Sequence, residues 1–385
     1  MARHLLVTND YPPKTGGIQV YLHELWRRLE PGRAVVLTAA SHPDAAAFDA
    51  ASEVVIERVR TPTLIWPTRR TLLAIEAAIE RHQPDLVLLD PAWPLGLLGP
   101  RLSRPYGVVL HGAEVTVPGR LPLVASSLRY VLRHAEVAVC AGSYPHAEAL
   151  RNAAEWMPPT IQVPPGVDTE RFVPLDPARR EAVRSSLGLS PSALLVSSYS
   201  RLVPRKGMDT LIRASALLVD TFPDLQVAIG GAGRDRARLE RMAKTISAPV
   251  VFLGRVDDED LPAWLGASDL MVMDCRSRWA GLEQEGFGIV FLEAGASGVA
   301  QVAGRSGGSH EAVRHGVSGL VVANPRSENE LAAAMSQLLA DASLRADYAL
   351  HARALAVQQF DWRVLAQRLA SGLATYDHGA THPVP

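Results

Sequence analysis

A repeated alternation of two kinds of segment constrains the fold of this 385-residue chain more than any other feature. Short apolar runs rich in β-branched residues alternate with amphipathic runs of helical period from one end of the chain to the other. This alternation predicts an α/β protein whose parallel strands are joined by helices. In the first half of the chain, strands are expected over residues 4–10, 34–38, 85–90, 106–112 and 137–140.

The pattern restarts after a proline-rich segment, residues 161–177, which therefore predicts a domain boundary. Further strands are expected over residues 193–202, 225–231, 250–254, 270–274, 299–304 and 319–322. We predict two Rossmann-like, doubly wound domains that face each other across a deep cleft, because open parallel sheets bind ligands at the carboxyl ends of their strands. The predicted division is 1–168, 169–360, a helix over about 361–376 that packs back on the first domain, and a flexible tail over 377–385.

Composition argues against several classes of protein. The formal net charge is −1, whereas nucleic-acid binders usually carry a basic surplus. The two cysteines, Cys140 and Cys275, are too few for a disulfide framework and are typical of a reducing compartment. The first residues contain an apolar core too short for a signal peptide, and no apolar run is long enough to span a membrane. We expect a cytoplasmic protein, or one that is peripheral on the inner face of the plasma membrane.

Two loops that follow expected strands could bind an anion. Gly16 and Gly17 lie between the first strand and the next helix, where glycine lets the backbone approach a ligand and a helix N-terminus favours negative charge. The sequence SRLVPRKG places Arg201, Arg205 and Lys206 at the end of another strand, and fixed cations at such a position suit a diphosphate. The alternatives are a plain strand–helix turn and a solvated basic loop.

The sequence EGFGIVFLE contains two glutamates, Glu285 and Glu293, that are eight positions apart. On one straight helix they would point about 80° apart and lie about 12 Å apart along the axis, so they could not form a close acid–base pair. We expect Glu285 on a loop and a helix that begins near Gly288, so that the amides of Gly288, Ile289 and Val290 can bind a phosphate. Glu285 can then accept hydrogen bonds from hydroxyl groups, and Glu293 lies a turn deeper on the ligand-facing side.

Two further features each have two interpretations, and a third is a weak signal. His111 follows a strand and could contact a polar ligand, although a lone histidine is more often structural. The acidic run around Asp258 could indicate a metal site, but acids also complement the dipole in the first turn of a helix. The sequence GGAGRD lacks the third glycine of a dinucleotide fingerprint, because Arg236 occupies that position.

Taken together, EGFGIVFLE, SRLVPRKG, PPGVDTERF and the amino-terminal GGIQ resemble the motifs of the family-4 retaining glycosyltransferases of the GT-B fold, over essentially the whole chain. Longer stretches such as SRLVPRKGMDTLI are similar to the actinobacterial members that transfer mannose from GDP-mannose to phosphatidylinositol monomannoside in an α-(1→6) linkage. The chain departs from the family at HGAE, where HGHE is expected. The resemblance places the acceptor site in this amino-terminal half.

The resemblance implies roles for the donor-side residues. Arg201 and Lys206 would hold the donor diphosphate and stabilise it as it leaves. Gly16 and Gly17 would approach the diphosphate or the transferred sugar. Glu285 would bind sugar hydroxyls.

It also implies how the rest of the nucleotide is held. Glu293 would bind the ribose, Val256 and Asp258 would read the guanine base, and His111 would lie near the transferred sugar. Cationic side chains and helix N-termini can relieve the charge on the leaving diphosphate. We therefore expect front-face transfer that needs neither a metal ion nor another cofactor, with the leaving phosphate taking the proton of the acceptor.

A lipid acceptor would bring the protein to a membrane surface, without nucleic acid and without an obligatory protein partner. Two segments without acids could lie on anionic headgroups, and the alternative is an ordinary amphipathic surface helix with salt bridges to its neighbours. Their notable residues are Arg58, Arg60, Trp66, Arg69 and Arg70 in 58–73, and Arg120, Arg129, Arg133 and His134 in 115–134.

Three other functions compete with this interpretation. The nearest is another family-4 glycosyltransferase with a different nucleotide-sugar donor or a soluble acceptor. A nicotinamide oxidoreductase would also have doubly wound units, but it requires the intact glycine fingerprint that GGAGRD lacks. A non-catalytic sugar-nucleotide-binding protein is the third, and the retention of both glutamates and both key cations argues against it.

Overall fold

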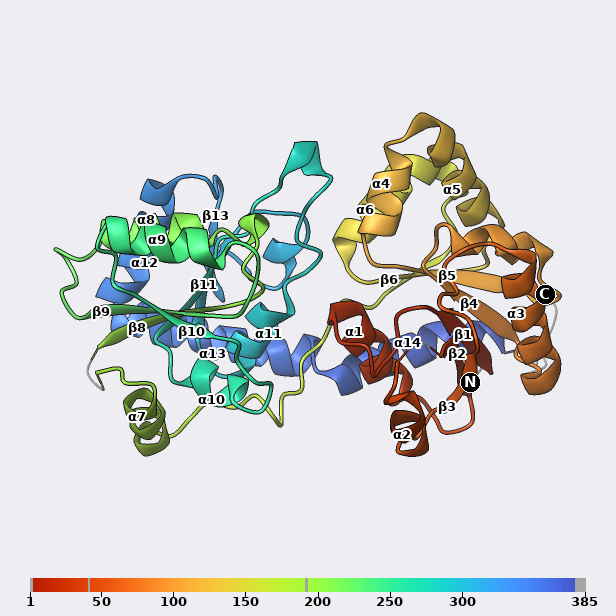
Figure 1. Cartoon of the computed structure of the whole chain (residues 1–385), viewed down its shortest axis with the longest axis horizontal. Coiled ribbons are helices and arrows are strands. Elements are labelled where there is room, and N and C mark those ends of the chain that lie inside the picture. Colours follow the sequence, from red (N-terminus) through yellow and green to blue (C-terminus); the bar gives the residue numbers. More distant parts are fainter. Residues whose placement is uncertain (1–2, 41, 191–192, 378–385) are drawn as a thin grey trace. The chain divides into compact units, whose positions relative to one another are not determined.

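The computed structural model describes residues 3–40, 42–190 and 193–377, so the predicted tail lies, except for its first residue, outside the described residues. The chain divides into two compact units. Unit 1 comprises Met1–Pro165 and Trp362–Pro385, and unit 2 comprises Gly166–Asp361. Each unit is built around its own parallel sheet with helices on both faces (Figure 1).

The sheet of unit 1 has the strand order β3-β2-β1-β4-β5-β6-β7, and all recorded pairs are parallel. The order reverses at β1 and β4, which is the arrangement of a doubly wound fold. The strands are β1 (His4–Thr8), β2 (Ala34–Ala39), β3 (Val55–Val59), β4 (Leu86–Asp90), β5 (Tyr106–Leu110), β6 (Ala138–Cys140) and β7 (Thr160–Gln162). The helices are α1 (Gly17–Trp26), α2 (Ala45–Ala50), α3 (Arg69–His82), η1 (Leu95–Arg101), α4 (Ala113–Gly119), α5 (Pro122–His134), α6 (Ser143–Ala153), η2 (Ala154–Trp156), α14 (Trp362–Leu373) and η6 (Ala374–Tyr376).

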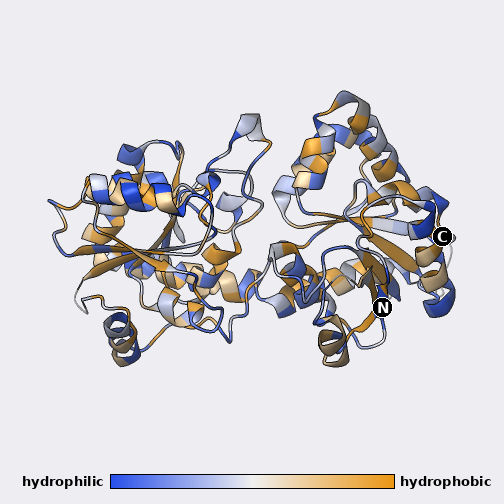
Figure 2. Cartoon of the chain, in the orientation of Figure 1, coloured by the Kyte–Doolittle hydropathy of each residue, from blue (hydrophilic) through white to orange (hydrophobic). Residues whose placement is uncertain are grey.

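Burial on both faces explains why the central strands of unit 1 are continuously apolar. Every residue of β1, β2, β4 and β5 is buried, and Figure 2 shows these strands as hydrophobic. One face packs against α3 and α5 through Ile75 and Leu128. The other packs against α1 and α14 through Leu22 and Leu365, so the last helix of the chain completes the core of unit 1.

Unit 2 repeats this architecture with the strand order β10-β9-β8-β11-β12-β13, which reverses at β8 and β11. The strands are β8 (Leu194–Tyr199), β9 (Leu225–Gly230), β10 (Val250–Gly254), β11 (Leu270–Met273), β12 (Ala300–Gly304) and β13 (Gly319–Val322). The helices are α7 (Pro177–Ser186), η3 (Pro204–Lys206), α8 (Met208–Ala216), α9 (Arg236–Thr245), α10 (Leu261–Gly266), η4 (Trp279–Gly281), α11 (Ile289–Ala296), η5 (Ser309–Glu311), α12 (Glu328–Ala340) and α13 (Ala342–Gln359).

Two apolar layers also enclose the sheet of unit 2. Leu211 of α8 and Met335 of α12 belong to the core on one face. Leu265 of α10, Phe291 of α11 and Leu355 of α13 belong to the core on the other. The loops that follow β8 and β11 are therefore carried by strands that are buried on both sides, which gives them a rigid base.

Two strands of unit 1 were not predicted, and two of its predicted strands end earlier than expected: β1 at Thr8 and β5 at Leu110. β3 is an edge strand that is exposed or half-buried along its length, so it lacks the continuous apolar run used to recognise the central strands. β7 is short and overlaps the start of the proline-rich region that predicts the domain boundary. The first strand ends at Thr8 and does not reach Asp10.

Candidate active site

Unit 1 brings three polar side chains together where its strand order reverses. Thr8 at the end of β1 and Asp90 at the end of β4 are register partners, and the Thr8 hydroxyl donates to Asp90 Oδ2 at 2.5 Å. His111, directly after β5, has its Nε2 2.9 Å from Asp90 Oδ1. The carboxyl edge of a sheet at such a reversal is the usual ligand position in doubly wound folds.

The surroundings of His111 favour its charged form. Burial alone would favour the neutral ring, but Asp90, together with smaller contributions from Glu114 and Asp10, outweighs burial and raises the pKa of His111. The Tyr21 ring packs on the imidazole in a T-shaped arrangement, with ring centroids 5.4 Å apart. Glu114, at the start of α4, accepts hydrogen bonds from the amides of His111 and Gly112 and so holds this loop. His111 is therefore a positioned hydrogen-bond donor whose surroundings favour the charged ring.

Gly16 and Gly17 lie at the same edge of unit 1, at the N-terminus of α1. Both are exposed, and a Cβ placed on Gly17 would meet no atom within 4 Å. The loop that leads to them is braced by a 2.7 Å hydrogen bond from Gln19 Nε2 to Asp10 Oδ1. Asp10 also contributes to the raised pKa of His111, so the glycine loop and the histidine share one neighbourhood.

The corresponding edge of unit 2 contains a buried ion pair. Lys206 ends the loop after β8, and Glu285 lies in the loop after β11, the two strands at which the order reverses. Lys206 Nζ is 2.7 Å from Glu285 Oε2, and the two side chains are only 10% and 12% exposed. Arg205 Nε lies 3.7 Å from the same oxygen. The structure thus joins the cationic motif and the glutamate motif, which are far apart in the sequence.

The charge state of Glu285 follows from this pairing. Burial opposes ionisation, but Lys206 and Arg205 outweigh it and lower the pKa of Glu285 below its ordinary value. The backbone fixes the loop as well, because the Glu285 amide donates to Ser306 Oγ at 3.3 Å and Gly308 donates to the Glu285 carbonyl at 2.9 Å. Glu285 is an ionised carboxylate that can accept further hydrogen bonds.

The helix after this loop begins where the sequence predicts. α11 starts at Ile289, and Gly288 is its N-cap in a left-handed conformation with φ of 84°. A Cβ on Gly288 would lie 2.8 Å from the Phe291 ring, so glycine is required here. The first amides of a helix have no acceptor within the helix, and those of Ile289 and Val290 therefore remain donors for an anion.

Glu293, one turn into α11, has a different environment from Glu285. Burial raises the pKa of Glu293 to about 7, with Arg171 acting to lower it and Asp258 to raise it. The Arg171 guanidinium also donates to the Asp258 carbonyl. Val256 is half-buried in the loop between β10 and α10, whereas Asp258 is exposed. Glu293 and the Asp258 loop are thus neighbours, linked through Arg171.

The glycines of GGAGRD serve packing. A Cβ on Gly231 would lie 1.9 Å from the carbonyl oxygen of Ser200, so glycine lets the loop after β9 approach the cationic loop. Leu202 donates to the Ala232 carbonyl at 2.9 Å across this contact. Arg201 lies exposed on the loop held in this way.

The predicted site residues therefore form one group in each unit. His111, Gly16 and Gly17 gather in unit 1, whereas the others lie in unit 2. Sequence reasoning missed Asp90 and Arg171. Asp90 could have been found because it ends a buried strand, and carboxyl ends of parallel strands carry ligand contacts. Arg171 lies in a motif used for the resemblance, but no sequence signal indicates its contact with the Asp258 loop.

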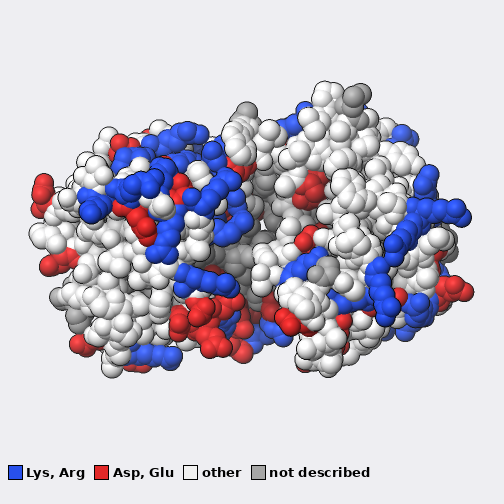
Figure 3. All heavy atoms as spheres, viewed as in Figure 1, with Lys and Arg blue, Asp and Glu red and all other residues white. Residues whose placement is uncertain are grey.

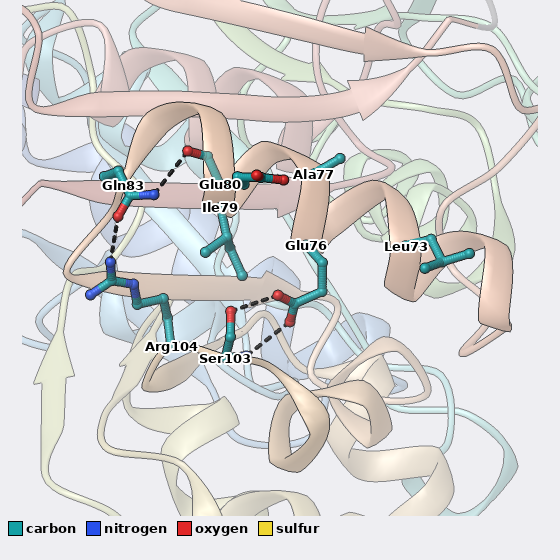
Figure 4. A pocket seen from close by; sticks show the side chains of 8 residues that line it. All are labelled: Leu73, Glu76, Ala77, Ile79, Glu80, Gln83, Ser103 and Arg104. Atoms are coloured by element: carbon teal, nitrogen blue, oxygen red, sulfur yellow. Dashed lines mark hydrogen bonds between the residues drawn. The ribbon is translucent and has the colours of Figure 1, made fainter.

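A pocket elsewhere in unit 1 contains none of these residues. It has a volume of about 600 Å³ and is lined by Leu73, Glu76, Ala77, Ile79, Glu80, Gln83, Ser103 and Arg104 (Figure 4). Its polar groups satisfy one another, because Ser103 donates to Glu76 and Arg104 donates to Gln83 at 2.6 Å. It lies beside the segments that enter β4 and β5, at the amino ends of these strands, opposite the edge that carries His111.

The two basic segments of unit 1 are partly engaged in contacts within the unit. Arg58 forms an ion pair with Asp49 at 2.7 Å, so it is not available to an anionic surface. Arg120 lies 3.5 Å from Glu148, and Arg129 Nε donates to the Asn152 carbonyl at 3.1 Å. Arg133 lies over the Trp156 ring at 4.1 Å. In contrast, Arg60, Trp66, Arg69 and Arg70 are exposed.

Two features are absent from the described residues. Within them, no group of three or more His, Cys, Asp or Glu side chains could hold a metal ion. In the same part of the chain, no helix is both long and apolar enough to cross a bilayer.

Two Rossmann-like units, each with polar groups at the point of strand-order reversal, are the architecture of the GT-B class of glycosyltransferases. Solved structures of this class are similar over nearly the whole chain. Anabaena Alr3699/HepE in complex with UDP has a TM-score of 0.81 at 22% identity, covering 97% of this chain and 100% of that one. Sucrose-phosphate synthase from Thermosynechococcus elongatus has a TM-score of 0.77 at 20% identity, with 97% and 98% coverage.

Sequence comparison is more specific. Residues 15–171 match Glycosyltransferase Family 4, and residues 179–355 match Glycosyl transferases group 1. The GDP-mannose-dependent alpha-(1-6)-phosphatidylinositol monomannoside mannosyltransferase of Mycolicibacterium smegmatis is 38% identical over 381 residues, covering 96% of this chain and 98% of that protein. The GDP-mannose-dependent monoacylated alpha-(1-6)-phosphatidylinositol monomannoside mannosyltransferase of Corynebacterium glutamicum is 35% identical over 373 residues, covering 95% and 96%. The chain therefore belongs to glycosyltransferase family 4.

Proposed function

We propose that this chain is a retaining mannosyltransferase that moves mannose from GDP-mannose to phosphatidylinositol monomannoside. The product would be the α-(1→6)-linked dimannoside used in the biosynthesis of phosphatidylinositol mannosides, lipomannan and lipoarabinomannan. The observation that carries the transferase assignment is the meeting of Lys206, Arg205 and Glu285 beside the N-terminus of α11. The substrates follow from the names of relatives that match nearly the whole chain.

Unit 2 is the proposed donor-binding unit. Arg201, Lys206 and the first amides of α11 would receive the diphosphate, because preorganised donors stabilise the charge that develops as the nucleotide leaves. Glu285, held by Lys206, would accept hydrogen bonds from the sugar hydroxyls. This pairing leaves it poorly disposed to act as a covalent nucleophile, which favours front-face transfer with the leaving phosphate as base.

The nucleoside would occupy the neighbouring surface of unit 2. Glu293 would accept hydrogen bonds from the ribose hydroxyls. Val256 and Asp258 would contact the guanine, whose N1–H and amino groups are donors that a carboxylate can accept. Charge relief by arginine, lysine and helix amides makes a metal ion unnecessary in this scheme.

Unit 1 is the proposed acceptor-binding unit. His111, whose charged form Asp90 favours, would donate to a hydroxyl or phosphate oxygen of the substrates. Gly16 and Gly17 would let a phosphate or sugar approach the start of α1. The acceptor is a membrane lipid, so we propose that the enzyme works as a peripheral protein at a membrane surface.

The decisive experiment measures transfer from radiolabelled GDP-mannose to vesicles that contain purified phosphatidylinositol monomannoside, with EDTA present and UDP-glucose as a parallel donor. A doubly mannosylated lipid from GDP-mannose alone is the expected result. Nucleotide release without a lipid product would redirect the search to soluble acceptors within the family. Turnover of UDP-glucose but not of GDP-mannose would overturn the donor assignment.

A variant separates catalysis from simple binding. Glu285→Ala should abolish turnover while leaving a folded protein that still responds to GDP in thermal shift. Unchanged turnover in this variant would instead support a site elsewhere in the chain.

A further inference from the structure

A short hairpin in the loop between β11 and α11 carries an exposed tryptophan. Arg278 and Glu283 close it as an antiparallel bridge, with backbone hydrogen bonds of 2.9 and 3.2 Å and a side-chain ion pair of 2.8 Å. Trp279 at the tip is 63% exposed and has φ of 49°, a left-handed conformation that is unfavourable for a bulky residue. Leu282 beside it is 46% exposed. The hairpin therefore presents two apolar side chains to solvent at a cost in backbone energy.

The base of this hairpin is fixed to the proposed donor site. Glu283 also accepts from Arg205 Nη1 at 3.5 Å, and Gln284 Nε2 donates to the Gly281 carbonyl at 2.7 Å. The next residue is Glu285, which binds Lys206. The hydrogen bonds and ion pairs at the base thus hold the tip in place. A surface or molecule that binds Trp279 would therefore lie near the carboxyl edge of the unit 2 sheet.

The side chains around the base are mainly cationic. The guanidinium of Arg278 lies 4.8 Å from the Trp279 ring centroid. Arg305 and Arg326 are exposed. Arg305 precedes Ser306, whose Oγ lies 3.4 Å from Ser277 Oγ at the foot of the hairpin, and Arg326 Nη2 lies 3.4 Å from the Ser277 carbonyl. Among the described residues, neither of these two arginines forms an ion pair. The nearby carboxylate of Glu283 is only 17% exposed, so it offsets little of their charge at the surface. More widely, Lys and Arg gather over α8 and α9 of the same unit (Figure 3).

We propose that this hairpin docks on the surface of an anionic phospholipid bilayer, with Trp279 and Leu282 at the level of the headgroups and Arg305 and Arg326 against lipid phosphates. Tryptophan suits this interface because its ring is apolar and its N–H is polar, and each exposed cation adds attraction to an anionic surface. The inference rests on the proposed lipid acceptor for its purpose. It places a membrane contact in the donor-binding unit, separate from the basic segments of unit 1.

The first test measures binding, which does not depend on transfer. Vesicles of phosphatidylglycerol and phosphatidylcholine, and vesicles of phosphatidylcholine alone, are titrated into wild-type protein and Trp279→Phe. The difference in emission between the two proteins reports Trp279 itself, and we expect a blue shift with anionic vesicles at low salt. An emission difference that does not change with anionic vesicles would overturn the proposal.

A test variant and a matched control measure how much the Trp279 side chain contributes to vesicle binding. Trp279→Gly removes the ring and accepts the left-handed backbone without strain, so it should fold normally. It should weaken vesicle binding by roughly tenfold, since the loss corresponds to the burial of one large apolar side chain. Leu350→Ala, which removes a 68% exposed side chain on α13 of the same unit, is the control and should bind vesicles as the wild type does.

The second test separates membrane docking from recognition of the acceptor. Trp279→Gly is compared with wild type on vesicle-presented phosphatidylinositol monomannoside and on its deacylated, water-soluble form. Docking predicts a raised apparent KM on vesicles only. An equal loss on both acceptors would assign Trp279 to acceptor binding and overturn docking, whereas failure of the proposed function would abolish transfer in the wild type while leaving the vesicle-binding result standing.

Discussion

Lys206 Nζ and Glu285 Oε2 lie 2.7 Å apart at the carboxyl edge of unit 2, although 79 positions separate them in the chain. The strand-order reversal at β8 and β11 makes this contact, because the two loops leave adjacent strands in the same direction. In the proposed function, this pair supplies a fixed cation for the leaving diphosphate and an ionised carboxylate for the sugar hydroxyls.

Removal of Lys206 should affect catalysis and stability together. Lys206→Met should reduce kcat by about 10²–10³, the usual effect of losing one preorganised donor to a developing negative charge. It should also destabilise unit 2 by about 3 kcal/mol, because it leaves the Glu285 carboxylate buried without its nearest cation. Steady-state kinetics and urea denaturation measure the two effects. In the double variant with Glu285→Gln, stability should largely recover while activity stays lost, and additive stability losses would contradict a direct pair.

The same pair should shape stability in acid. The pKa of Glu285 is lowered in the folded chain, so its contribution to the free energy of unfolding is present above the unfolded pKa and is lost as pH falls through the folded pKa. Glu285→Gln should therefore be less stable than wild type at pH 7 and converge with it at low pH. Thermal unfolding from pH 3 to pH 7 tests this, and a constant difference across that range would rule the mechanism out.

Glu293 should make donor binding depend on pH. Its pKa is raised to about 7 by burial, so the carboxylate that we propose accepts hydrogen bonds from the ribose hydroxyls forms only as pH rises through that value. We expect the Kd of the wild type for GDP to fall between pH 6 and 8. In Glu293→Gln the Kd should not depend on pH, and at pH 8 it should be roughly tenfold higher than that of the wild type. Isothermal titration calorimetry at several pH values provides the measurement. A pH-dependent Kd in the variant would place the titrating group elsewhere.

Asp90 should act as a positioning residue for His111. Burial opposes the charge on His111, and Asp90 outweighs it, so Asp90→Asn should return the pKa of His111 to a lower value. The raised pKa contributes stability that is present below the unfolded pKa and is lost as pH rises through the folded pKa, and this dependence should disappear in the variant. The pH profile of kcat should move to lower pH while KM for GDP-mannose changes little. An NMR titration of the His111 ring that is unchanged by the substitution would contradict the assignment.

Asp274 should make unit 2 less stable at alkaline pH. Within the described chain, both of its carboxylate oxygens are buried without a recorded hydrogen-bond partner, and burial raises the pKa of Asp274 to about 8, with Arg276 acting to lower it and Asp209 to raise it. A raised carboxyl pKa favours folding at low pH, and the benefit is lost as pH rises through the folded pKa. Asp274→Asn should remove a loss of stability on the order of 4 kcal/mol between pH 5 and 8. Urea denaturation at pH 5 and pH 8 should show a smaller change in the free energy of unfolding for Asp274→Asn than for the wild type. An equal change in both proteins would assign the pH dependence to other groups.

The sequence by itself determined the class of fold, the strands that are buried on both faces, and the start of α11. These features are encoded locally, since a buried parallel strand must be continuously apolar and the left-handed cap before Ile289 requires Gly288. Local pattern could not reveal β3 or β7, because an edge strand that is half-exposed and a strand of three residues carry little periodicity.

Tertiary structure alone decided which charges meet. Arg205, Lys206, Glu285 and Glu293 were all visible as candidates, but only the strand order brings Lys206 to Glu285 while Glu293 remains apart from that pair. The Asp90–His111 contact likewise depends on β4 and β5 being neighbours in the sheet. The physical reason is that the energy of a charge depends on its burial and on its nearest partners, and these are set by contacts between segments that are distant in the sequence.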